Sequence, residues 1–137
     1  MVAAARHGMG VDHCSTPMEL STAATAERLT GFVGGTGTGH AVICASHRLA
    51  PQLLGTLADM QLSLPEQLSF ITFGDSDWAR AYRPAVAVIR FDRYREARRA
   101  TYEVLVALGG SPDTEATPPP PEYVGRESVG PCLPTET

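Results

Sequence analysis

The stretch from Leu64 to Trp78 constrains the fold more than any other part of the chain. Leu64 and Pro65 predict a turn, and residues 68–73 form an apolar run of strand length. The run ends in a glycine that is followed by two acids and a tryptophan. In an α/β protein, the carboxyl end of a buried strand is where backbone and polar side chains meet a ligand. The sequence therefore predicts a binding site directly after Phe73.

Strand-like and helix-like segments alternate along the rest of the chain. The predicted strands are residues 11–15, 40–45, 68–73, 85–90 and 122–128, and the second of these is expected to be buried on both faces. The predicted helices are the end of one at 1–9, then 21–32, the segment that follows a cap at Ser46, and 94–108. This alternation indicates an α/β fold with a mainly parallel sheet, covered on both faces.

Apolar residues recur at helical spacing in the last two predicted helices. They are Leu49, Leu53, Leu57 and Met60 in the first, and Ala97, Thr101, Val104, Leu105 and Leu108 in the second. Both sets are expected to face inward.

Composition excludes several classes of protein. The 11 basic and 15 acidic residues give a net charge of −4, which does not favour a nucleic-acid partner for this chain. Three cysteines at irregular spacing argue against a disulfide framework. No apolar run is long enough to span a membrane, and the N-terminus does not have the pattern of a signal peptide. We therefore expect a soluble cytoplasmic protein.

Segments spread along the chain follow the order and spacing of one known family. They are residues 41–50 (AVICASHRLA), 60–69 (MQLSLPEQLS), 73–78 (FGDSDW), 83–88 (RPAVAV), 93–109 and 124–128 (VGRES). These segments resemble motifs in the effector-binding domain of LacI/GalR-type transcriptional regulators.

The resemblance implies a parallel-sheet sandwich of the periplasmic-binding-protein-like type I fold, in which two lobes enclose a cleft. Residues 1–131 would supply most of the second lobe, plus a strand and a helix of the first at 85–108, and residues 132–137 would be a frayed tail. The helix-turn-helix and most of the first lobe would be absent. The helix of the first lobe would then lack its sheet partners.

Asp75 is the first candidate for contact with a ligand, because a carboxylate at a strand end accepts hydrogen bonds from sugar hydroxyls. The family usually has two acids here, whereas this chain has Gly74 and then Asp75. Asp75 could instead cap a turn or a helix. Ser46 and His47 match a second corner of the family site, where Ser46 either binds ligand or caps the helix. His47 replaces an acid, so the ligand or its affinity is expected to differ.

Trp78 is a candidate for stacking on a sugar ring, with core or dimer packing as the alternative. No metal site is expected, because His7, His13 and Cys14 match no zinc spacing. No cofactor is expected either, since the glycine run at 34–39 precedes a strand, whereas a phosphate loop follows one. One basic cluster consists of Arg90, Arg93, Arg95, Arg98 and Arg99. Interleaved acids indicate that it is a solvated helix face.

These observations favour the effector-sensing domain of a LacI/GalR-type regulator that binds a sugar-like molecule and is not an enzyme. In the family, such domains form homodimers and reach operator DNA through a helix-turn-helix. An alternative is a stand-alone small-molecule binding module without a transcriptional role. A third reading, a hydrolase or transferase that uses His47 and Asp75, has no recognisable catalytic context in the sequence.

Overall fold

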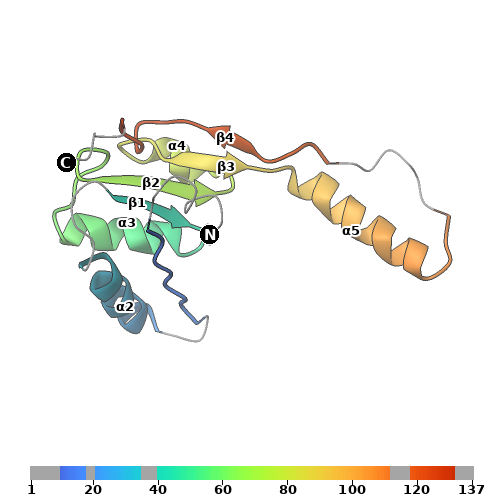
Figure 1. The fold of residues 1–137 in the computed structure, drawn as a ribbon, viewed down its shortest axis with the longest axis horizontal. Helices are drawn as coiled ribbons and strands as arrows, with labels where there is room; N and C mark the ends of the chain where they lie inside the picture. Colours follow the sequence, from blue (N-terminus) through green and yellow to red (C-terminus); the bar gives the residue numbers. More distant parts are fainter. Residues whose placement is uncertain (1–9, 18–20, 35–39, 112–117, 132–137) are drawn as a thin grey trace.

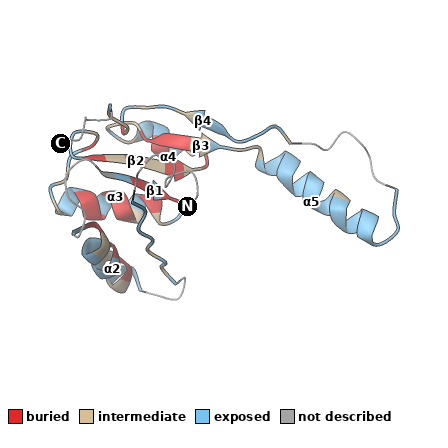
Figure 2. Ribbon diagram, in the orientation of Figure 1, coloured by how far each residue is buried: buried red, intermediate tan, exposed pale blue. Residues whose placement is uncertain are grey.

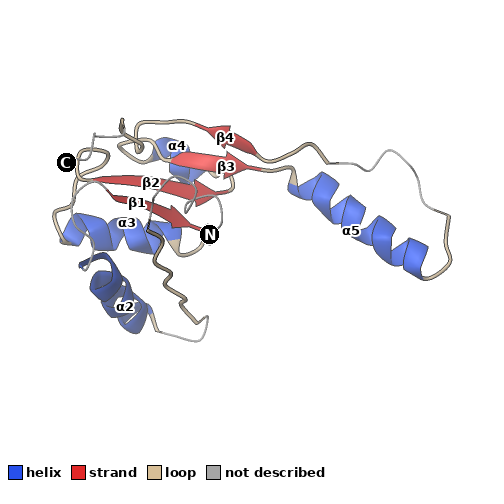
Figure 3. Cartoon of the chain, in the orientation of Figure 1, coloured by secondary structure: helices blue, strands red, loops and turns tan. Residues whose placement is uncertain are grey.

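A computed structural model of the 137-residue chain describes residues 10–17, 21–34, 40–111 and 118–131. Its sheet has the strand order β1-β2-β3-β4, comprising β1 (His40–Cys44), β2 (Leu68–Phe73), β3 (Ala87–Arg90) and β4 (Glu122–Val124). The described helices are α2 (Thr22–Gly34), α3 (Ala50–Asp59), α4 (Asp77–Ala81) and α5 (Arg93–Ala107). The first three strands are parallel and β4 is antiparallel to β3, as Figures 1 and 3 show. The expected mainly parallel α/β fold is confirmed.

One face of the sheet carries the hydrophobic core. Val42 of β1 is in register with Phe70 of β2, and Thr72 of β2 is in register with Val88 of β3, so these buried side chains share a face. The helices α2, α3 and α4 add their buried residues to the same cluster, which includes Leu29, Leu53, Leu54, Leu57 and Ala79. Right-handed crossovers that run in one direction across a sheet put their helices on one face. This topology accounts for the single core layer.

The second face of the sheet is only partly covered, which corrects the expectation of two covered faces. Ile43 is 60% exposed and Tyr123 is 53% exposed, while Ile71, Phe73 and Ile89 are half-buried. The strand at 40–45 is therefore buried on one side rather than on both. The reason is topological, because α3 and α4 both pack against the first face.

Helix α5 projects away from the sheet and its helices (Figures 1 and 2). The predicted helix is confirmed, but the prediction that its apolar residues face inward is wrong for the described part of the chain. None of its residues is buried, and Val104, Leu105 and Leu108 are 58%, 51% and 79% exposed. No described element lies beside this helix to cover its apolar side (Figure 2).

Other boundaries differ from the sequence prediction. Residues 11–15 form no strand, because their backbone groups do not pair with the edge strand β1. The predicted strand at 122–128 ends at Val124, and the following residues continue toward the start of β3, where Ser128 bonds to Ala85 and to Phe70 of β2. The predictions for residues 1–9, for the glycines at 35–39 and for the tail at 132–137 lie outside the described residues. Within the described residues, no helix is both long and apolar enough to cross a membrane.

Ser128 lies in the segment after β4 and links β2 to the start of β3 by hydrogen bonds. Its hydroxyl donates to the Phe70 carbonyl at 2.6 Å and accepts from the Ala87 N–H at 2.8 Å. Its backbone accepts from the Phe70 N–H and donates to the Ala85 carbonyl. Ser128 is fully buried, so these bonds are formed away from water.

We predict that Ser128→Ala lowers the free energy of unfolding by roughly 2–6 kcal/mol, because two buried backbone groups lose their partner and each costs about 1–3 kcal/mol. Urea unfolding measures the change, and Ser15→Ala, at an exposed serine, is the matched control. Equal stability of the two variants would contradict this role for Ser128.

Candidate functional site

The carboxyl ends of the parallel strands lie at one edge of the sheet. Cys44 is in register with Thr72, and Phe73 is in register with Ile89, so β1, β2 and β3 end nearly level. The residues that follow these ends include Ser46 and His47 after β1, and Gly74 and Asp75 after β2. The sheet therefore brings the candidate residues of two separate sequence segments to the same edge.

Gly74 sets the direction in which the chain leaves β2. Its φ of +85° lies in the left-handed region that favours glycine, and its N–H donates to the Ile89 carbonyl at 2.9 Å. A Cβ atom at this position would lie 2.8 Å from the Arg93 guanidinium. Glycine at the first acid position of the family pattern therefore fits both the turn and its arginine neighbour.

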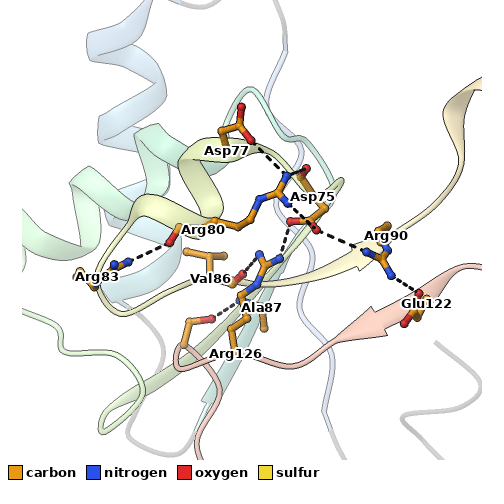
Figure 4. Close-up of polar contacts among 10 residues, drawn as sticks. Asp75, Asp77, Arg80, Arg83, Val86, Ala87, Arg90, Glu122 and Arg126 are labelled. Atoms are coloured by element: carbon orange, nitrogen blue, oxygen red, sulfur yellow. Dashed lines mark hydrogen bonds and ion pairs between the residues drawn. The ribbon is translucent and has the colours of Figure 1, made fainter.

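Asp75 is largely buried and is held by an arginine from the C-terminal segment. Its Oδ1 accepts from Arg126 Nη2 at 2.6 Å, and the side chains of Asp75 and Arg126 are 9% and 14% exposed. The other terminal nitrogen of Arg126 donates to the Val86 carbonyl at 2.8 Å. The ion pair thus connects the end of β2, the entry to β3 and the segment after β4 (Figure 4).

Two further arginines approach the other carboxylate oxygen of Asp75. Arg80 Nη1 lies 3.8 Å from Oδ2, and Arg90 Nη1 lies 4.0 Å from it. Both separations exceed hydrogen-bonding distance, so neither arginine donates a hydrogen bond to Oδ2. We refer to Asp75, Arg80, Arg90 and Arg126 together as the arginine corner.

Arg80 and Arg90 also reach acids at the solvent boundary of the corner. Arg80 lies 3.3 Å from Asp77, whose side chain is fully exposed, and donates to the Asp75 carbonyl at 3.2 Å. Arg90 donates to Glu122 at 2.6 Å across β3 and β4, and this hydrogen bond raises the pKa of Arg90. Arg90 therefore remains a cation at every physiological pH.

The second corner is formed by the residues after β1. The Ser46 hydroxyl accepts from the Leu49 N–H at 3.4 Å, and the Ser46 carbonyl accepts from Leu49 and Ala50. Ser46 therefore caps the turn that leads into α3. His47 is exposed, so its imidazole is accessible from solvent.

Cys44 lies beneath this corner with its thiol in the core. Its Sγ donates to the Ser46 carbonyl at 3.3 Å, and burial raises the pKa of the Cys44 thiol. The thiol is therefore protonated at neutral pH, which is the unreactive form.

Trp78 lies on α4, between Asp75 and Arg80 in the sequence. It is half-buried and packs against the hydrophobic core cluster. Part of its surface remains accessible, so packing and ligand contact are compatible at this position.

The sequence reading did not assign Arg80 or Arg126 to the site. It attributed Arg90 to a solvated helix face, whereas Arg90 is the last residue of β3. Two features of the sequence could have indicated these residues. Arg90 is at the end of a predicted strand, and Arg126 lies in the VGRES segment that resembles the family motif. Within the described residues, no three metal-ligating side chains come together.

We predict that Asp75→Asn and Arg126→Gln each lower the free energy of unfolding by about 3–5 kcal/mol, because each removes the charged hydrogen-bond partner of a largely buried side chain. The double variant should lose less than the sum of the two, as chemical denaturation of all four proteins can measure. The control cycle uses Arg99 and Glu103, an exposed pair on α5. Its coupling should not exceed about 0.5 kcal/mol. Additive losses at Asp75 and Arg126 would refute the pairing.

Comparison with known proteins identifies the family. A family model described as a periplasmic binding protein-like domain matches residues 2–129. A probable opine utilization operon repressor from Rhizobium rhizogenes is 35% identical over 82 residues, which cover 60% of this chain and 39% of that protein.

Solved structures agree with this assignment. A LacI-family regulator from Bifidobacterium animalis subsp. lactis superposes with a TM-score of 0.74 at 20% identity, covering 96% of this chain and 48% of that one. A sugar-binding LacI-family regulator from Escherichia coli, in complex with phosphate, gives a TM-score of 0.70 at 20% identity and covers 95% and 48%. The chain thus spans about half the length of these structures. It belongs to the periplasmic binding protein-like domain family, and its fold is similar to part of each of these LacI-family regulators.

Proposed function

We propose that this chain is the ligand-sensing part of a LacI/GalR-type transcriptional regulator and that it binds a sugar-like small molecule at the carboxyl edge of its sheet. The fold places strand ends and polar residues where ligands bind in open α/β sheets. A curated relative is a probable operon repressor, and a solved neighbour is described as sugar-binding. Both names support the proposal.

The observation that carries the proposal is the state of the Asp75 carboxylate. One oxygen is bound to Arg126, which fixes the orientation of the group. The other is flanked by guanidinium nitrogens that lie too far away to hydrogen-bond to it. A fixed carboxylate with a remaining acceptor oxygen suits a ligand hydroxyl, because little conformational freedom is lost on binding.

The remaining candidates have complementary proposed roles. Ser46 and His47 would offer a hydroxyl and an imidazole from the end of β1, and both residue types donate or accept a hydrogen bond. Trp78 would contribute apolar area to one side of the ligand through the part of its ring that the core leaves accessible.

Regulation would require parts beyond the sensor domain. We propose that the full regulator is a homodimer that binds operator DNA through a separate helix-turn-helix module. The net charge of −4 on this chain fits a sensing role better than direct contact with DNA. Ligand binding would then change DNA affinity through a coupling free energy between two sites. The proposed role is binding, not catalysis.

We expect one or more sugars or sugar derivatives to raise the thermal stability of the chain, by roughly 2.7 kcal/mol at a hundredfold excess over the dissociation constant. Differential scanning fluorimetry against a panel of sugars, sugar acids and sugar phosphates tests this. The shift should be lost in Asp75→Asn and reduced in His47→Ala.

His13→Ala is the matched control for His47→Ala, because both histidines are exposed and only His47 lies at the sheet edge. The intrinsic stability of Asp75→Asn is measured without ligand, so that loss of binding is distinguished from loss of folding. A shift that survives unchanged in both site variants would place the ligand elsewhere and contradict the proposed site.

A further inference from the structure

We propose that the arginine corner selects a ligand that carries an anionic group, a carboxylate or a phosphate, next to a hydroxyl. This inference rests on the proposed function and narrows its ligand class from sugar-like molecules in general to hydroxylated acids and sugar phosphates.

Several guanidinium groups converge on Asp75. Three guanidinium groups have a nitrogen within 4.0 Å of this one carboxylate. Arg126 and Asp75 neutralise each other in the least exposed part of the corner. Arg80 and Arg90 lie at the other oxygen with their side chains about half exposed, and each also pairs with an acid at the surface.

The acids that pair with Arg80 and Arg90 are exposed to solvent. Asp77 is fully exposed and Glu122 is 62% exposed, so both pairs are in contact with water. Exposed ion pairs contribute about 0–1 kcal/mol, and a ligand anion can share or replace such a partner at small cost. Guanidinium groups also have five N–H donors, so each arginine retains donors beyond those used here.

A further cation, Arg93, lies beside the arginine corner. The Arg93 guanidinium lies against Gly74, where a Cβ would approach it to 2.8 Å, and stacks over Phe91 at 5.4 Å from the ring centroid. Stacking orients the planar group at the end of β2. Arg93 therefore adds positive charge at the turn from which Asp75 projects.

Together these groups define the shape of the ligand. A hydroxyl can donate to Asp75 Oδ2, while an anionic oxygen beside it accepts from Arg80 and Arg90. Both arginine nitrogens lie within 4.0 Å of the same atom, Asp75 Oδ2, and the proposed carboxylate or phosphate would bind beside that atom (Figure 4). A neutral sugar would satisfy Asp75 but leave the two cations without a new partner.

The test is a titration of the whole chain with glucose, gluconate and glucose 6-phosphate, and with the corresponding galactose series. Trp78, the one tryptophan of the chain, lies in α4 between Asp75 and Arg80 and gives a fluorescence signal at the corner. We expect an acid or a phosphate to bind at least tenfold more tightly than its neutral parent. The preferred member of each series distinguishes a carboxylate ligand from a phosphate ligand.

The variants Arg80→Gln and Arg90→Gln should each weaken binding of the anionic ligand by roughly tenfold or more, as expected for a lost charged hydrogen bond. Binding of the neutral sugar should change less than twofold. Arg99→Gln is the control, because Arg99 has the same 54% exposure as Arg80 but lies on α5.

Equal affinity for neutral and anionic members, with no effect of the arginine variants, would overturn the anionic selectivity. If that binding were still lost in Asp75→Asn, the proposed sugar-sensing function would stand. If the chain bound no member of either series, both proposals would be contradicted.

Discussion

The ion pair between Asp75 and Arg126 is the interaction on which the arrangement of the site depends. It joins residues that are far apart in the sequence, and Arg126 also donates to the Val86 carbonyl. Two residues further along, Ser128 bonds to both Phe70 and Ala87. The C-terminal segment therefore fixes β2 against β3 at the core and fixes the Asp75 carboxylate at the sheet edge. Because the same segment does both, the geometry of the site is linked to the stability of the sheet.

The topology of the sheet accounts for the apolar surface that remains exposed. Both crossover helices pack on one face, so Ile43 and its neighbours on the other face are accessible. Helix α5 leaves the sheet after Arg90 with Val104, Leu105 and Leu108 exposed. Large exposed apolar patches often mark sites of contact with other protein.

Local sequence patterns predicted most of the described strands and helices, because each pattern reports a local periodicity, but they did not predict the short helix α4. The strand at Leu68–Phe73 and the helices α2, α3 and α5 follow directly from apolar spacing. Burial depends on topology, so the pattern of 40–45 did not reveal that Ile43 is exposed. Residues 11–15 had the composition of a strand but lacked a partner. The position of Asp75 at a strand end was predictable, whereas its pairing with Arg126, 51 residues away, required the fold.

We propose that ligand is sensed at the carboxyl edge of the sheet, around the arginine corner. Nuclear magnetic resonance tests this directly, by following backbone amide and arginine Nε signals while a sugar acid or sugar phosphate is added. We expect the largest shifts at Ser46, Gly74 and Asp75 and at the side chains of Arg80 and Arg90. Shifts concentrated on the exposed face around Ile43 and Tyr123, or along α5, with the corner unchanged, would contradict it.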